Sequence, residues 1–415
     1  MTTPYPGAPV PGAPPAPEDA GSETLRAPFG SVPPAVASHP TGPQAVAPAP
    51  WPPLPSARPS TSPPPAMPAP PPASFQAPAY YQSPAAPPPP PPGTPPTADQ
   101  DAARAALIRL RSEVGKAVIG QDAAVSGLVV ALLCRGHALL EGVPGVAKTL
   151  LVRTLARALT LDTKRLQFTP DLMPGDVTGS LFYDTKTGEF GFRPGPVFTN
   201  LLLADEINRT PPKTQAALLE VMEERQVSID GTPRLLPSPF AVLATQNPVE
   251  HEGTYPLPEA QLDRFLVKVT LPLPPRDDEI KVLAHHAAGF DPSDLDAAGV
   301  TAVAGPAELA IARAGARAVQ VRPEVLAYIV DVARATRSQP SVLLGVSPRG
   351  ATALLATSKA WAWLSGRGYA TPDDVKALAR ATLRHRISLR PEAELDGVTG
   401  DRVLEQVLAT VPVPR

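Results

Sequence analysis

Proline is distributed along this 415-residue chain in a way that restricts where a folded domain can lie. The chain contains 60 prolines, and 35 of them fall within residues 1–96. Each proline lacks a backbone donor and fixes φ, so a segment with proline at about every third position forms neither helices nor central strands. The same segment has too few large apolar residues to offset the entropy of ordering it. We therefore predict a disordered arm at residues 1–97, followed by a folded body.

Proline runs such as residues 87–92 are typical of extended polyproline II segments, which stay stiff over several residues. Two functions are consistent with such an arm. It can act as a solvated spacer, which is the reading we favour, or it can present a ligand to an aromatic-lined groove of a partner. Tyr80 and Tyr81 are the residues that we expect to make such a contact.

Charge and cysteine content exclude several classes of protein. The net charge of −2 gives no electrostatic basis for binding nucleic acid or an anionic membrane. The single cysteine, Cys134, rules out an internal disulfide and a multi-cysteine metal site, and it suits a reducing compartment. The sequence shows neither a signal-peptide pattern nor an apolar run of about 18 residues that could span a membrane. We therefore expect a cytoplasmic protein.

Beyond the arm, short apolar runs alternate with segments of helical periodicity. This alternation is typical of a parallel sheet covered by helices on both faces. We expect an α/β core at residues 98–274, with strands at 137–140, 165–168, 200–205, 240–245 and 265–269. Only helical patterns follow, and they predict an all-helical domain at residues 275–415, with helices at 277–288, 307–319, 323–337, 347–364 and 371–386.

Two segments interrupt the alternation, and we predict that they form β-hairpins. The first lies within residues 174–196, with strands at 180–183 and 189–192. The second has strands at 227–229 and 233–236 on either side of an Asp230-Gly231 turn. We expect both hairpins to project from the sheet rather than to extend it.

One segment follows a predicted strand and opens a helix, which is the context of a phosphate-binding loop. Its glycines let successive backbone N–H groups turn toward an anion, and the helix N-terminus adds the positive end of its dipole. Lys148 can reach the β- and γ-phosphates, and the Thr149 hydroxyl can hold Mg²⁺. Ala147 departs from the standard pattern, which has glycine there. The loop consists of Gly142, Val143, Pro144, Gly145, Val146, Ala147, Lys148 and Thr149.

The apolar run at residues 201–204 ends in two carboxylates, Asp205 and Glu206. Packing gives no reason for a buried strand to end in this way. Asp205 can bind the water shell of Mg²⁺, and Glu206 can polarise a water for attack on the γ-phosphate. Because this strand end and the phosphate loop occur in one chain, the sequence predicts an ATP-hydrolysing protein rather than a kinase or a small GTPase.

Three further polar residues are candidates for the same site. Asn247 ends another apolar strand and would orient the attacking water. Arg264 stands just before a strand and would face away from the nucleotide of its own subunit, so we expect an arginine finger that acts on a neighbour. Arg349 begins a helix of the second domain and could meet the γ-phosphate from that side.

With these motifs the chain resembles the AAA+ ATPases, and within them the MoxR type, over about residues 102–411. The motifs that carry the resemblance lie at 118–121, 141–149, 204–215, 222–224, 244–248 and 347–350. Alanine at position 147 is usual in this family, so that departure supports the resemblance. The proline-rich arm lies outside the family pattern.

The resemblance implies that Ile119, Gly120 and Gln121 line the adenine pocket and that Arg349 contacts the nucleotide. It also implies a hexameric ring, and it identifies the hairpin at 174–196 as the helix-2 insert of the clade. Members of the family are chaperone-like remodellers of protein clients. They often mature partners or insert metal into them, together with a von Willebrand factor A-domain protein.

We therefore predict a P-loop NTPase with a three-layer α/β core and a helical lid, which hydrolyses ATP with Mg²⁺ as cofactor. Two alternatives stay open. The chain could be a nucleotide-gated scaffold or adaptor that hydrolyses ATP negligibly. It could also be a nucleic-acid motor, although its near-neutral charge gives that function little support.

Overall fold

The computed structural model describes residues 97–186, 188–247 and 254–414. The predicted arm therefore lies outside the described residues, apart from Thr97. The described residues belong to one compact unit, Pro84–Arg415. Thr97 caps the first helix of this unit, because its hydroxyl accepts a hydrogen bond from the backbone N–H of Gln100 at 3.3 Å.

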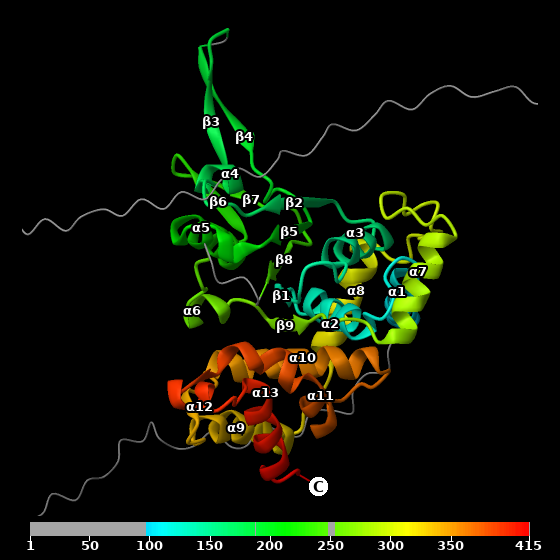
Figure 1. Ribbon diagram of the computed structural model, residues 1–415, viewed down its shortest axis with the longest axis vertical. Helices are drawn as coiled ribbons and strands as arrows, with labels where there is room; N and C mark the ends of the chain where they lie inside the picture. The colour runs from blue at the N-terminus through cyan, green and yellow to red at the C-terminus, as the bar shows by residue number, and fades with distance from the viewer. Residues whose placement is uncertain (1–96, 187, 248–253, 415) are drawn as a thin grey trace, which may run out of the picture. The chain divides into compact units, whose positions relative to one another are not determined.

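A five-stranded sheet lies at the centre of this unit (Figure 1). The strand order is β2-β5-β8-β1-β9, and every neighbouring pair is parallel. The predicted parallel sheet is thus confirmed, and each strand begins and ends within two residues of its predicted limits. The strands are β1 (Ala138–Glu141), β2 (Thr163–Gln167), β5 (Leu201–Asp205), β8 (Ala241–Gln246) and β9 (Val267–Thr270).

Helices cover both faces of the sheet. Along β5, Leu201 and Leu203 belong to one hydrophobic cluster, whereas Leu202 belongs to another. This alternation arises because successive side chains of a strand point to opposite faces. The first cluster includes α1 (Ala98–Gly115), α2 (Asp122–Leu133) and α3 (Lys148–Ala158), and the second includes α5 (Pro212–Glu224). The predicted three-layer core is confirmed.

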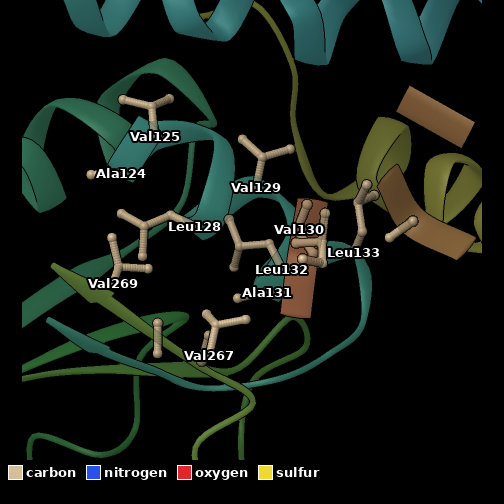
Figure 2. Close-up of a cluster of buried hydrophobic side chains, with 14 of the residues drawn as sticks. Ala124, Val125, Leu128, Val129, Val130, Ala131, Leu132, Leu133, Val267 and Val269 are labelled. Atoms are coloured by element: carbon tan, nitrogen blue, oxygen red, sulfur yellow. The ribbon is translucent and has the colours of Figure 1, made fainter. Parts of the chain in front are cut away.

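Helix α2 is apolar around most of its circumference, and most of its residues are buried. Figure 2 shows Leu128 and Leu132 of α2 near Val267 and Val269 of β9, within one cluster of aliphatic side chains. A helix that is hydrophobic all round needs partners on several sides. Helix α2 has them, because it also packs against α1, α8 (Pro306–Ala318) and α10 (Pro348–Leu364).

Both predicted hairpins are present. The first pairs β3 (Gly179–Asp184) with β4 (Glu189–Pro194), next to the short helix α4 (Pro174–Thr178), and it extends away from the sheet in Figure 1. The second pairs β6 (Gln226–Ile229) with β7 (Thr232–Leu235). Its turn residues Asp230 and Gly231 have φ values of 52° and 71°, and a two-residue type I′ turn requires positive φ at both positions.

Helices dominate the C-terminal part, as predicted, but this part is not entirely helical. It also contains an antiparallel pair of short strands, β10 (Val342–Leu344) and β11 (Ser388–Leu389), that the sequence analysis missed. Strands of two or three residues are too short to show alternation. The helices are α9 (Pro323–Arg337), α10 (Pro348–Leu364), α11 (Pro372–Leu383), η3 (Arg384–Arg386), α12 (Pro391–Leu395) and α13 (Gly400–Thr410).

Two helices connect the sheet region to this C-terminal part. Helix α7 (Arg276–Ala287) has no buried residue, whereas α8 (Pro306–Ala318) packs against α1, α2 and α10. One hydrophobic cluster consequently runs from α1 to α13. The predicted boundary between residues 274 and 275 is therefore not marked by separate cores, and it stays a prediction. In the described part of the chain, no helix combines the length and the apolarity that a membrane span requires.

Candidate functional site

Three neighbouring strands of the sheet bring the predicted polar residues to one edge. Strand β1 leads into the phosphate loop, β5 ends at Asp205, and β8 ends next to Asn247. Because β8 lies between β5 and β1 and all three run parallel, their carboxyl ends lie side by side. The carboxyl edge of an open parallel sheet is the usual place for a ligand site in such folds.

The phosphate loop is preorganised by its backbone. Gly145 and Ala147 have φ values of 88° and 60°, and α3 begins at Lys148. A side chain at Gly142 would place its Cβ 2.8 Å from the carbonyl oxygen of Leu271, so the loop requires glycine there. Lys148 Nζ donates a hydrogen bond to the carbonyl oxygen of Gly142 at 2.7 Å, which folds the lysine back over the loop.

A cavity of about 780 Å³ opens at this edge of the sheet. Most of the predicted nucleotide-binding residues line it, including Lys148, Thr149, Asp205, Glu206 and Asn247. The other predicted residues in the lining are Ile119, Gln121, Pro144, Gly145, Val146 and Ala147. Gly120, Gly142 and Val143 do not line the cavity but lie next to residues that do.

Asp205 is held by two partners. Its Oδ1 accepts a hydrogen bond from the Thr245 hydroxyl at 2.5 Å, and its Oδ2 accepts two from the Arg165 guanidinium, at 2.7 and 3.0 Å. Asp205 is only 7% exposed. Burying an unpaired carboxylate is costly, and here Thr245 and Arg165 compensate its charge. The sequence analysis did not single out Arg165, because only the pairing of β2 with β5 brings the two residues together.

Glu206 has the left-handed backbone conformation, with φ of 57°. Its backbone N–H donates to the Thr245 hydroxyl at 2.8 Å, and its carboxylate accepts a hydrogen bond from the Gln167 amide at 2.7 Å. Arg209 lies 3.2 Å from the same carboxylate. Positive φ is uncommon for a residue with a side chain and persists where surrounding contacts enforce it, often at functional sites.

The structure does not bring the two predicted arginines to this cavity. Arg264 and Arg349 line a second cavity, of about 320 Å³. Glu223 lies 3.0 Å from Arg264 and 3.7 Å from Arg349, and Asp263 also lies 3.7 Å from Arg349. Arg264 does not line the cavity that contains Lys148, and its action on a neighbouring subunit stays a prediction. Arg349 likewise lines the second cavity and not the one that contains Lys148, and its contact with the γ-phosphate stays a prediction.

Comparison with known proteins identifies the family. A model of the ATPase family associated with various cellular activities (AAA) matches residues 137–267, and a model of the AAA lid domain matches residues 334–407. The chaperone MoxR1 of Mycobacterium tuberculosis is 42% identical over 312 residues, which cover 73% of this chain and 81% of that protein. The chain belongs to the MoxR-type AAA+ ATPases.

Two further similarities agree with this membership of the MoxR-type ATPases. Protein MoxR of Methylorubrum extorquens is 35% identical over 340 residues, which cover 75% of this chain and 96% of that protein. The crystal structure of a Cytophaga hutchinsonii protein has a TM-score of 0.70 at 40% identity, and the match covers 76% of this chain and 97% of that one.

The nucleotide cavity of this MoxR-type ATPase has a wall that the sequence analysis missed. Helix α7 and the residues after it contribute Val282, His285, His286 and Phe290 to the lining. The ring of His285 stacks on Phe290 with centroids 4.1 Å apart and an interplanar angle of 14°. The sequence analysis did not predict this wall, since no periodicity shows that a helix will lie over a cavity.

The cavity of the MoxR-type ATPase contains donors suited to Mg²⁺. Mg²⁺ prefers oxygen ligands, keeps several waters, and is usually held by one or two protein groups together with substrate phosphates. The Thr149 hydroxyl and the Asp205 carboxylate both line the cavity and supply such oxygens. Among the described residues, no group of three or more His, Cys, Asp or Glu side chains could hold a metal ion.

Proposed function

We propose that this MoxR-type ATPase hydrolyses ATP with Mg²⁺ and couples hydrolysis to the chaperone-like remodelling of protein clients. The observation that carries the proposal is that Lys148, Thr149, Asp205, Glu206 and Asn247 all line one cavity of about 780 Å³. They come from two strand ends and one helix start that are adjacent only in the folded chain. This volume lies within the range of about 300–1,000 Å³ that is usual for small-molecule pockets.

Each residue has a proposed role that follows from its chemistry. Lys148 would neutralise charge on the β- and γ-phosphates, and the N–H groups at the start of α3 would donate to phosphate oxygens. Thr149 and Asp205 would hold Mg²⁺, which would supply positive charge to offset the charge that develops on the phosphates. Glu206 would accept a proton from the attacking water, which Asn247 would orient. Ile119, Gly120 and Gln121 would surround the adenine.

Arg264 and Arg349 would act on a neighbouring subunit. Both line the second cavity and not the nucleotide cavity of their own chain, which is why we assign them to a nucleotide bound by an adjacent copy. A guanidinium supplied in trans stabilises transition-state charge in related phosphoryl-transfer reactions and is worth roughly 10³–10⁵ in turnover. The hexamer expected from the resemblance supports this assignment.

The partner proteins follow from family membership. One relative carries the name chaperone, and on that basis we propose protein clients for this chain. A von Willebrand factor A-domain partner and a role in metal insertion or maturation are part of the same proposal. We also propose a cytoplasmic, reducing setting, because a single cysteine suits such a compartment.

The substitution Glu206→Gln tests the proposal. It removes the proposed proton acceptor and keeps the shape of the side chain, so we expect ATP affinity to stay within a few-fold and turnover to fall by about 10²-fold or more. Nucleotide binding is measured by calorimetry and turnover by phosphate release. Asp230→Asn, in the turn of the second hairpin, serves as a control for the loss of one carboxylate.

Normal turnover in Glu206→Gln would contradict the assignment of Glu206. An unmodified protein that binds ATP and assembles but releases phosphate negligibly would instead support the scaffold function.

A further inference from the structure

A groove lies where α1, α2 and α10 meet, apart from the nucleotide cavity and the second cavity. Its volume is about 150 Å³. Small-molecule pockets usually enclose about 300–1,000 Å³, so this groove suits one or two side chains of a peptide rather than a nucleotide-sized ligand. We call it the three-helix groove. Its lining includes Leu107, Ile108 and Arg111 of α1, Val125 and Val129 of α2, and Trp361 of α10.

The walls of the three-helix groove are apolar, and part of their surface is exposed. Ile108 is 56% exposed, and Trp361 is only partly buried where it packs against the cluster that runs from α1 to α13. Figure 2 shows Val125 and Val129 on the side of α2 that faces away from Val267. One exposed aliphatic residue needs no explanation, but here apolar side chains of three helices converge on one surface.

The polar side chains of the groove are hydrogen-bond donors. Ser126 and Ser365 contribute hydroxyls to the lining, and the side chain of Arg111 is 60% exposed. Arg111 Nε donates to Asp122 at 2.6 Å, and a guanidinium has four further N–H donors. Among the described residues, no carboxylate lines the groove. The groove therefore suits a ligand that carries acceptors and apolar surface.

We infer that the three-helix groove binds the proline run at residues 87–92 of the same chain. A proline run presents backbone carbonyls as acceptors and has no backbone N–H. Segments in the polyproline II conformation bind grooves that contain aromatic side chains, and they lose little entropy because their conformation is already restricted. Trp361 is the aromatic residue of this lining. The end of the arm is thus assigned a contact, whereas the sequence analysis favoured a solvated spacer.

The place of α1 in the chain brings the proline run within reach of the groove. Helix α1 begins at Ala98, so Leu107 and Arg111 lie about 14 and 20 Å along it at a rise of 1.5 Å per residue. Residues 87–96 span about 31 Å when they rise by 3.1 Å each, as in polyproline II. The remaining length of about 11 Å allows the chain to reverse direction, and Gly93 has the backbone freedom that a reversal needs.

The short connection also makes a weak contact sufficient. Joining two binding partners by a short linker gives an effective concentration on the order of 1 mM. A contact with a dissociation constant below this value occupies the groove most of the time. A groove of about 150 Å³ is therefore large enough to hold the arm, although it would bind a separate peptide weakly.

Disulfide trapping in the full chain tests the contact. The test variant carries Pro90→Cys in the proline run and Ile108→Cys in the groove. A disulfide requires Cα atoms within about 7 Å, so trapping under mild oxidation by copper phenanthroline reports direct proximity. Burial raises the pKa of the native Cys134 thiol to about 12, so this thiol stays protonated and does not compete.

The matched control combines Pro90→Cys with Arg109→Cys. Arg109 is exposed and lies one residue further along α1, but it is about 100° around the helix and does not line the groove. A tether without a docking site would bring Pro90→Cys to both positions equally. We expect the Ile108→Cys variant to form the intramolecular disulfide about tenfold faster than this control, because docking raises the local concentration of the proline run at the groove.

Two further variants show whether the proline run and the aromatic side chain make the contact. Replacing the other prolines of residues 87–92 with glycine should lower the trapping rate to that of the control, whereas the same change at residues 63–65 should leave it unchanged. The glycine substitutions lie outside the folded body and do not alter its packing. Trp361→Leu should also slow trapping, and its melting temperature shows whether the variant is folded.

Mixing experiments identify which chain supplies the arm. Chains with only Pro90→Cys are mixed with isotope-labelled chains that carry only Ile108→Cys, and mass spectrometry detects any disulfide between them. If this intermolecular disulfide forms faster than the intramolecular one, a second copy supplies the arm and the same-chain assignment is wrong. Equal trapping of Ile108→Cys and Arg109→Cys, or unchanged trapping in the glycine variant, would overturn the inference. None of these results depends on ATP hydrolysis.

Discussion

At the scale of single residues, Thr245 connects the two carboxylates of the nucleotide cavity. Its hydroxyl donates to Asp205 Oδ1 at 2.5 Å and accepts from the backbone N–H of Glu206 at 2.8 Å. Thr245 is fully buried, and it holds Glu206 in its left-handed conformation. Conformational strain at Glu206 is therefore maintained by a residue that does not line the cavity.

We predict that Thr245→Val lowers both stability and turnover. The substitution keeps the shape of the side chain but leaves a buried acceptor and a buried donor without a partner, which should cost about 1–3 kcal/mol of unfolding free energy. Urea unfolding and steady-state phosphate release measure the two effects. Thr154→Val is the control: that hydroxyl is equally buried, yet it donates only to the carbonyl oxygen of Leu150 within α3. Equal effects of the two substitutions on turnover would contradict the role of Thr245.

The burial of His137 leads us to predict that the unfolding free energy depends on pH. Burial lowers its pKa to about 4, and the ring accepts a hydrogen bond from the backbone N–H of Val242 at 2.9 Å. The unfolded chain binds a proton below about pH 6.5 and the folded chain does not, so unfolding free energy falls as pH drops from 6.5 to 4. We expect this residue to contribute up to about 3 kcal/mol over that window. Burial, followed by the charge of Arg386, also lowers the pKa of His385, which adds to the trend.

The measurement is urea unfolding at several pH values, for the unmodified chain and for His137→Asn. The variant lacks one titrating group, so its unfolding free energy should vary with pH by up to about 1.4 kcal/mol per unit less than that of the unmodified chain between pH 4 and 6.5. Identical slopes would show that His137 does not stay neutral in the folded state.

At the scale of elements, Arg386 of η3 joins the helical part to the loop before β9. Its Nε donates to Asp263 Oδ1 at 2.6 Å, and its other nitrogens donate to backbone carbonyls, among them those of Phe265 at 2.9 Å and Leu266 at 3.1 Å. The residue is 8% exposed. Arg264 lies between the residues that Arg386 holds, so this contact also positions the proposed finger.

We expect Arg386→Leu to destabilise the chain by about 3–5 kcal/mol, because it leaves the Asp263 carboxylate and several carbonyls without their partner. Arg380→Leu, on α11, is the matched control, since it removes an exposed arginine that pairs with Glu405. Exposed pairs contribute about 0–1 kcal/mol. Urea unfolding compares the two variants. Similar losses of unfolding free energy would mean that the buried contact of Arg386 stabilises the chain no more than the exposed pair does.

At the scale of the whole molecule, the proposed water-activating residue and the proposed finger line separate cavities. Arg264 lies in the second cavity, whereas Glu206 lines the first. A chain by itself would therefore lack a finger at its own nucleotide. Assembly would supply one from each neighbour.

We predict that Arg264→Ala retains ATP binding and loses turnover by about 10²-fold or more, because one transition-state charge is removed. Mixing this variant with Glu206→Gln should restore part of the turnover, since sites with an intact Glu206 would then meet a neighbour with an intact Arg264. Phosphate release is followed across mixing ratios. No recovery at any ratio would contradict action in trans.

The sequence by itself determined the strands, most helices and the positions of the polar residues at the strand ends. Strong local signals account for this success: apolar runs bounded by glycine or proline, a lysine and threonine at the start of a helix, and the Asp230-Gly231 turn. All are short-range patterns, and local backbone preferences respond to them directly. The short β10–β11 pair escaped detection because its few residues carry no such pattern.

Only the tertiary structure decided which residues share a cavity. Pairing of β2 with β5 brings Arg165 to Asp205, and the position of α7 adds His285 and Phe290 to the nucleotide cavity. Arg313 of α8 donates to the carbonyl oxygen of Leu132 because α2 ends beside α8. Arg349 likewise lies with Arg264 rather than with Lys148. Contacts of this kind join residues tens to hundreds of positions apart. They depend on how elements pack, and periodicity along the chain contains no information about that.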